Sequence, residues 1–163
     1  MLIELTNAAI PKEIDENMAS LEARGQTAMI VYMEGQYLGI IAVMDVARKE
    51  AKATLAKLHA MGINRTIMLT GDNQKVANAV AKEIGITDPK GNLLPEDKVR
   101  AIEKLIKEEG VVAMLGDGVN DAPAMAKSTI GIAMGAAGSD VALETADIAL
   151  MSDKLENLPL PLP

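Results

Sequence analysis

Two carboxylates and an amide lie close together in the segment MLGDGVNDAPAM, residues 114–125. Asp117 and Asp121 are four positions apart in this segment, and Asn120 lies between them. Carboxylate and amide oxygens are the ligands that a hard cation such as Mg²⁺ prefers. The segment therefore indicates a magnesium site, and a turn followed by a helix N-cap is the structural alternative for the same residue types.

A hydroxyl and several backbone N–H groups follow the apolar run RTIML, residues 65–69. This second segment reads Thr70-Gly71-Asp72-Asn73 and comes directly before a helical pattern. Backbone N–H groups at a helix N-terminus bind anions, so the segment is suited to a phosphate group. A Thr-Gly-Asp sequence by itself is more often an ordinary turn.

A lysine completes the set, because Lys98 in the segment PEDK falls in the first turn of a helix that Pro95 begins. By itself, a lysine among charged neighbours is more often a solvated side chain. The three segments together supply a hydroxyl, an ammonium and an acid pair. These are the groups needed to hold a phosphoryl group and offset its charge.

The elements that would position these groups alternate between strand and helix from residue 44 onward. Apolar residues at helical spacing, each time followed by a glycine, occur at residues 50–61, 74–84 and 95–109. Short apolar runs typical of buried strands occur at residues 65–69, 111–115, 129–134 and 148–151. The pattern predicts an α/β fold with a mostly parallel sheet and helices on both faces, in which the run 111–115 is buried on both sides. Ligands of such sheets bind beyond the carboxyl ends of the strands, close to all three polar segments.

The beginning of the chain has a different pattern. Residues 14–24 are expected to form an amphipathic helix, and residues 27–33 and 37–44 read as two strands joined by a turn at residues 34–36. We expect this helix and hairpin to be the end of an antiparallel module that leads into the α/β part near Asp45.

Composition excludes several kinds of protein. The net charge of −7 argues against nucleic acid as a partner, because phosphate backbones are bound by clusters of Lys and Arg. There is no cysteine, which excludes a disulfide framework, a zinc–thiolate site and a thiol nucleophile. The apolar runs are far shorter than the roughly 20 residues that span a bilayer. This composition indicates a soluble, intracellular, acidic domain.

The segments LTGDN, PEDK and MLGDGVNDAPAM resemble the phosphorylation domain of the P-type cation-transporting ATPases, which belong to the haloacid dehalogenase-like superfamily. The resemblance extends over about residues 11–159, and GDGVNDAPA is a highly specific signature. Residues 130–159 are most similar to the heavy-metal branch, in particular to its zinc, cadmium and lead pumps. The implied fold is a Rossmann-type, mostly parallel sheet preceded by a helix and β-hairpin from the nucleotide-binding domain.

The resemblance implies roles at the phosphate. Thr70 and Gly71 would hold the transferred phosphoryl group, and Lys98 would pair with it. Asp72 would lie near the nucleotide, and Asn120 would complete the polar surroundings. The implied reaction is hydrolysis of ATP through an aspartyl phosphate, coupled to the export of a divalent metal ion.

The resemblance also implies a Mg²⁺ ion held by Asp117 and Asp121, with Asp121 acting beside Thr70 and Lys98 in catalysis. Asp45 and Arg48, in the sequence DVAR, resemble the hinge motif where the chain returns from the nucleotide-binding domain.

The implied organisation has three parts: residues 1–44 as the tail of the nucleotide-binding domain, residues 45–157 as an incomplete phosphorylation domain, and residues 158–163, LPLPLP, as an extended tail. The implied partners are the rest of the ATPase, namely the remaining nucleotide-binding domain, the first strand of the phosphorylation domain and the transmembrane helices. This part of the parent protein would lie on the cytoplasmic side of a membrane.

One motif of the family does not occur in the sequence. The nucleophile of the family lies in an Asp-Lys-Thr-Gly-Thr motif at the end of the first strand, and none of the 163 residues form that motif. Asp45 follows an apolar run, but the residues after it do not match. In this fold the first strand lies between the runs 65–69 and 111–115. We expect the gap to be closed by another segment, by self-association with a second copy, or by rearrangement.

Three hypotheses about function stay open from the sequence. The first is a cytosolic fragment of a heavy-metal ATPase that carries the phosphate and Mg²⁺ site without the nucleophile and is inactive alone. The second is a non-catalytic phosphate- and Mg²⁺-binding regulatory module. The third is a stand-alone phosphatase of the same superfamily that uses an atypical Asp.

Overall fold

The computed structural model describes residues 10–44, 46–117, 120–135, 140–152 and 154–159. The helices and strands in chain order are α2 (Lys12–Ala23), β1 (Thr27–Met33), β2 (Gln36–Val43), α3 (Ala51–Ala60), β3 (Ile67–Leu69), α4 (Gln74–Ile84), β4 (Asp88–Lys90), α5 (Pro95–Glu109), β5 (Ala113–Gly116), α6 (Ala122–Met125), β6 (Ile130–Met134), α7 (Asp140–Thr145) and β7 (Ile148–Leu150), followed by the 3₁₀ turn η2 (Leu155–Asn157). Within these ranges no helix is long and apolar enough to cross a membrane.

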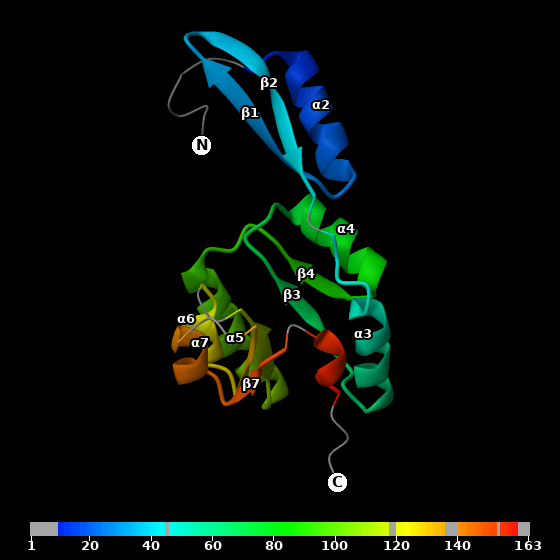
Figure 1. The fold of residues 1–163 in the computed structure, drawn as a ribbon, viewed down its shortest axis with the longest axis vertical. Coiled ribbons are helices and arrows are strands. Elements are labelled where there is room, and N and C mark those ends of the chain that lie inside the picture. The colour runs from blue at the N-terminus through cyan, green and yellow to red at the C-terminus, as the bar shows by residue number, and fades with distance from the viewer. Residues whose placement is uncertain (1–9, 45, 118–119, 136–139, 153, 160–163) are drawn as a thin grey trace.

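A helix and a β-hairpin form the N-terminal module, which is the blue and cyan unit of Figure 1. Strands β1 and β2 are antiparallel, and Met33 pairs with Gln36 across a two-residue loop. Both loop residues, Glu34 and Gly35, have positive φ angles of 49° and 85°. Two successive positive φ angles are the requirement of the turn that matches the twist of a hairpin. The predicted helix and hairpin are confirmed, with the second strand beginning one residue early.

The rest of the chain is the predicted α/β part, but its strands form two separate parallel sheets. One sheet has the order β3-β4 and the other the order β5-β6-β7. Among the described residues, β3 pairs only with β4, and β5 pairs only with β6. The gap expected between the runs 65–69 and 111–115 therefore occurs between β3 and β5. No described strand closes it.

The core lies where α5 and α6 cover the larger sheet. Five buried residues form it: Ile102, Met114, Ala124, Met125 and Ala133. Leu69 of β3 packs against the same cluster, so side chains connect the two sheets although no strand pairing does. Methionine suits such a core because its flexible side chain fills irregular gaps.

The prediction that residues 111–115 are buried on both sides is wrong for the first part of that run. Val111 is 69% exposed and lies ahead of β5, which begins at Ala113. Ala113 is itself exposed, whereas Met114 is buried. Val112 is half-buried and packs against the core, as Met114 does, so the run 111–115 is buried only in part.

Candidate functional site

The segment after β3 folds into a closed loop. The hydroxyl of Thr70 donates to Oδ2 of Asp72 at 3.0 Å, and the backbone N–H of Asp72 donates back to Thr70 Oγ1 at 3.1 Å. Asn73 is the N-cap of α4, because its Oδ1 accepts the backbone N–H of Val76 at 2.9 Å. The loop therefore presents a hydroxyl and backbone N–H groups at the start of a helix, as the sequence predicted.

The segment after β4 holds this loop through its backbone. Thr70 N–H donates to the carbonyl of Lys90 at 2.9 Å, and the N–H of Leu93 donates to the carbonyl of Thr70 at 3.1 Å. The N–H of Asn92 donates to the carbonyl of Asp72 at 2.6 Å. The conformation of the candidate phosphate loop therefore depends on a second segment about 20 residues later in the chain.

Gln74 adds a side-chain connection between the same two segments. Its Oε1 accepts the backbone N–H of Gly91 at 2.7 Å, and its Nε2 donates to the carbonyl of Pro89 at 2.9 Å. Neither this role of Gln74 nor strand β4 was predicted from the sequence. No local signal could have identified either, because a three-residue strand that contains a proline has no recognisable pattern.

Lys98 and Asp121, from two separate helical segments, form an ion pair. Lys98 lies in the first turn of α5, and its Nζ is 2.7 Å from Oδ1 of Asp121. The side chains are 14% and 18% exposed, so water screens the pair only partly. Asp121 also precedes α6, but its side chain makes no capping hydrogen bond. The alternative that its carboxylate is simply a helix cap is therefore wrong.

Gly116, the last residue of β5, allows Asp121 to approach. A Cβ atom at Gly116 would lie 2.8 Å from Cβ of Asp121, 2.9 Å from its Oδ2 and 3.2 Å from Sδ of Met125. These distances are too short for a side chain of any size. The glycine of the motif therefore has a steric function, which is to let the carboxylate lie directly against the end of the strand.

Asp117 and Asn120 are both exposed and flank residues 118–119, which lie outside the described ranges. Within the described ranges, no group of three or more acidic or histidine side chains forms a closed metal cage. Mg²⁺ does not require such a cage, because it usually binds one or two carboxylates, water and substrate phosphates. The carboxylates of Asp117 and Asp121, four positions apart after β5, are of the kind that this mode of binding uses.

Of the two predicted hinge residues, the structure describes only Arg48. Asp45 lies outside the described residues, so the structure does not describe its position. Arg48 is exposed ahead of α3, and its carbonyl accepts the backbone N–H of Ala51 at 2.9 Å. His59, expected at the surface, is exposed on α3.

The positions of the elements bring the phosphate loop and the acidic segment to one core. Thr70 directly follows Leu69, whose side chain packs on the cluster that contains Met114 of β5. Gly116 and Asp117 follow Met114 at the end of that strand. Thus Thr70, Lys98 and Asp121 lie around a common core although they come from three separate stretches of sequence.

The chain is similar in sequence to known hydrolases and metal-transporting ATPases. A family model described as a haloacid dehalogenase-like hydrolase matches residues 3–129. A probable cadmium-transporting ATPase of Alkalihalophilus pseudofirmus is 52% identical over 96% of this chain and 22% of its own length. A cadmium-transporting ATPase of Staphylococcus aureus is 54% identical over 89% of this chain and 20% of its own length. The chain therefore spans about a fifth of these relatives.

Among solved structures, a zinc-transporting PIB-type ATPase in its E2·Pi state matches with a TM-score of 0.71 and 45% identity. The match covers 91% of this chain and 24% of that protein.

Proposed function

The chain belongs to the haloacid dehalogenase-like hydrolase family, and from this premise we propose that it is the phosphate- and Mg²⁺-binding part of a heavy-metal P-type ATPase. The whole enzyme would hydrolyse ATP and export a divalent ion such as Cd²⁺ or Zn²⁺, the ions named for its relatives. Residues 1–44 would then belong to the nucleotide-binding domain and residues 45–157 to the phosphorylation domain, with Asp45 and Arg48 at the hinge.

The observation that carries this proposal is the ion pair of Lys98 with Asp121, on the same core as the strand that leads into the closed loop of Thr70. The Lys98 ammonium lies mostly out of water, where it would attract a phosphoryl oxygen more strongly than an exposed lysine would. The Thr70 hydroxyl now donates to Asp72, and it would turn to donate to the phosphoryl group. Gly71 would add a backbone N–H, and Asp72 would then be available to the nucleotide.

The second half of the site would hold the metal. A Mg²⁺ ion on Asp117 and Asp121 would offset the negative charge of the phosphoryl oxygens. Asn120 would add a polar group next to it. Asp121 would then have two partners, Lys98 and the ion, which fixes its carboxylate in the orientation that both require.

The attacking carboxylate would come from the partner that closes the gap between β3 and β5. In the parent enzyme this is the first strand of the phosphorylation domain, which ends in the motif that these 163 residues do not contain. The chain alone would bind phosphate and Mg²⁺ without turning over ATP. The same missing motif favours a second candidate function, a non-catalytic phosphate- and Mg²⁺-binding module.

The test is binding of inorganic phosphate to the chain in the presence of Mg²⁺, followed by ³¹P NMR. The wild type should bind phosphate. Thr70→Val should weaken binding at least about 10-fold, which is the loss expected for one hydrogen bond to a charged group. The control variant Thr145→Val, on α7, should bind like the wild type. No binding by a folded wild type, or equal binding by both variants, would contradict the proposal.

A second assay tests the third hypothesis drawn from the sequence, a stand-alone phosphatase. After incubation with Mg²⁺ and γ-labelled ATP and an acid quench, the chain should carry no hydroxylamine-sensitive label. Label on the chain would instead support a stand-alone phosphatase with an atypical Asp, and Asp45 would be the residue to replace first.

A further inference from the structure

A carboxylate of the N-terminal module reaches the residue that caps α4. Oε1 of Glu22, on α2, accepts Nδ2 of Asn73 at 3.3 Å, and Oε2 of Glu22 accepts Nζ of Lys75 at 3.2 Å. The side chain of Glu22 is 21% exposed, while that of Lys75 is 62% exposed. Of the two interactions, the one with Asn73 is thus the better shielded from water.

Asn73 is held from both sides by this arrangement. Its Oδ1 accepts the backbone N–H of Val76 and its Nδ2 donates to Glu22, so both ends of the amide are used. The residue directly before it is Asp72, which accepts the hydroxyl of Thr70. A chain of hydrogen bonds and one peptide bond therefore runs from Glu22 to the candidate phosphate loop.

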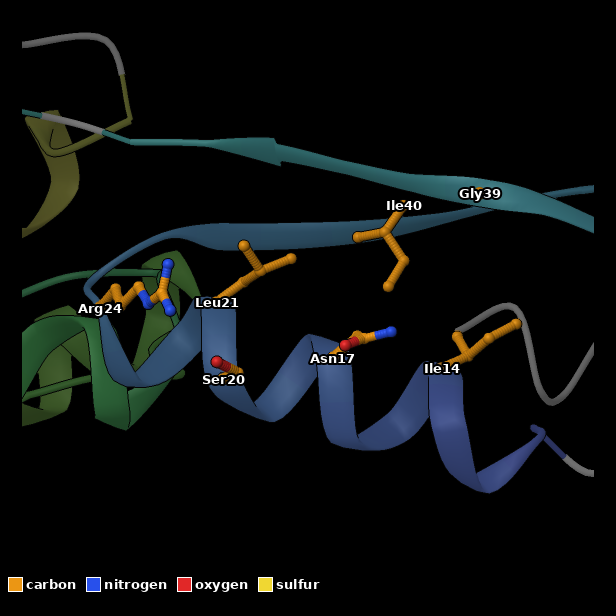
Figure 2. Close-up of a pocket in the computed structure, with 7 residues that line it drawn as sticks. All are labelled: Ile14, Asn17, Ser20, Leu21, Arg24, Gly39 and Ile40. Carbon is orange, nitrogen blue, oxygen red and sulfur yellow. The ribbon is translucent and has the colours of Figure 1, made fainter.

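Packing next to Glu22 keeps the two helices close. Gly25, which ends α2 with a φ angle of 80°, is buried, and a Cβ atom there would lie 3.4 Å from Cβ of Ala79 on α4. On its other side, α2 packs less closely against the hairpin. A groove of about 460 Å³ lies between α2 and β2, with Ile14, Leu21 and Ile40 among its lining residues (Figure 2). Glu22 does not line this groove and faces α4 instead.

We propose that Glu22 is a positioning residue for the phosphate loop: it fixes the Asn73 amide, and through it couples the docking of the N-terminal module on α4 to phosphate binding at Thr70. This inference rests on the proposed function and adds a residue that touches neither phosphate nor metal. By linkage, the coupling is reciprocal, so bound phosphate should also stabilise the contact between α2 and α4.

The physical basis is preorganisation of the loop. The partial exposure of Glu22 reduces the contribution of its charge, so the bond to Asn73 has the strength of an ordinary hydrogen bond, which a glutamine oxygen can also accept. Without Glu22, Asn73 can change rotamer and leave the N–H of Val76 without its cap. The loop then loses its conformational entropy when phosphate binds rather than when the chain folds, which weakens phosphate binding.

The first experiment follows amide hydrogen exchange by NMR at Asp72 and Val76, without ligand. Glu22→Ala should accelerate exchange at both amides by about 3- to 10-fold, the loss expected for one partly exposed hydrogen bond. Glu22→Gln keeps an oxygen that accepts Asn73 and should behave like the wild type. Lys75→Met removes the exposed ion pair but keeps the bond to Asn73, so it should also leave both amides unchanged.

The outcomes separate the explanations. Equal acceleration in Glu22→Ala and Glu22→Gln would overturn the proposal and show that charge alone matters. Unchanged exchange in Glu22→Ala would also overturn it, because the contact would then be only a surface interaction. Should Glu22→Ala fail to fold, Glu22→Gln and Lys75→Met still test the proposal, since faster exchange at Asp72 or Val76 in either variant would overturn it.

The second experiment measures the Kd of inorganic phosphate, with Mg²⁺, for the same variants. Glu22→Ala should bind about 3- to 10-fold more weakly, by the same loss of one hydrogen bond, and Glu22→Gln like the wild type. If the wild type itself binds no phosphate, the proposed function fails, whereas the exchange data still decide whether Glu22 orders the loop. If the wild type binds and Glu22→Ala binds equally well, only the coupling fails.

Discussion

The ammonium of Lys98 and the carboxylate of Asp121 meet at 2.7 Å although 23 positions separate the two residues in sequence. Both side chains are more than four-fifths buried, which makes each the main partner available to the other's charge within the described residues. An intact pair in this setting stabilises the fold little, but removing one partner is costly because it leaves the other charge buried and unpaired.

Replacing Lys98 tests the cost of leaving Asp121 buried without its partner. Lys98→Met should lower the free energy of unfolding by about 1–3 kcal/mol, below the range for a fully buried pair because the site is partly exposed. It should also abolish phosphate binding. Urea unfolding followed by circular dichroism measures the first effect and ³¹P NMR the second. Lys104→Met, which removes an exposed pair with Glu108 on the same helix, should change the unfolding free energy by less than about 0.5 kcal/mol. Equal effects of both variants would contradict the burial argument.

Gly116 should tolerate no side chain. In Gly116→Ala the new methyl group would lie 2.8 Å from Cβ of Asp121, so the carboxylate must move away from Lys98. We expect a loss of about 1–3 kcal/mol in unfolding free energy, which is typical of overpacking, together with loss of Mg²⁺-dependent phosphate binding.

The control for that variant is Ala113→Ser, an exposed position on the same strand. It should change the unfolding free energy by less than about 0.5 kcal/mol and keep phosphate binding. A Gly116→Ala protein with wild-type stability and binding would show that Asp121 can shift without losing its function.

Asp97 makes the stability of the start of α5 depend on acid pH. Its carboxylate accepts the backbone N–H of Leu94 at 3.0 Å and pairs with Arg100. The Leu94 N–H first, and then Arg100, hold the pKa of Asp97 below its ordinary value. Because the pKa is lower in the folded state, the stabilisation is complete above the unfolded pKa of about 3.9 and is lost as the pH falls through the folded value.

The measurement is an NMR titration of the Asp97 carboxyl carbon together with the amides of the first turn of α5. The midpoint should lie below the ordinary value, and the amide of Leu94 should titrate with it. In Asp97→Asn that transition of Leu94 should disappear. A midpoint at or above the ordinary value would show that the N–H of Leu94 does not stabilise the charged form.

Local signals explain which parts of the fold could be predicted from the sequence. Helix α4 was predicted with its observed ends, because Asn73 caps its start and Gly85 ends it in a left-handed conformation with a φ angle of 91°. Strands β1 and β2 were predicted because their turn residues and apolar patterns lie within a few positions of one another. The division of the sheet was expected only from the missing motif.

Long-range contacts explain what could not be predicted. Strand β4 exists because it pairs with β3, and nothing in Asp88–Lys90 alone indicates a strand. The sequence placed Lys98 and Asp121 in one site but could not show that they contact each other. Glu22 and Asn73 are 51 positions apart, and a glutamate on an amphipathic helix is normally solvated.

The open edges of β3 and β5 lead to the last prediction. Each strand has one described partner, and Leu69 and Met114 already pack on a common core, so one more parallel strand would hydrogen-bond to both sheets. A synthetic peptide with five apolar residues followed by Asp-Lys-Thr-Gly-Thr should bind the chain, with a Kd on the order of 100 µM because a short peptide pays for its own ordering. Backbone hydrogen exchange should slow at both strand edges. With γ-labelled ATP and Mg²⁺, label should appear on the peptide and not on the chain.

The control is the same peptide with a proline in place of its third apolar residue. It lacks the backbone N–H that would donate to the neighbouring strand there, so it should bind at least about 10-fold more weakly. If neither peptide binds while sedimentation shows a stable dimer of the chain, the edges pair with a second copy instead, and self-association, one of the three explanations drawn from the sequence, accounts for the gap.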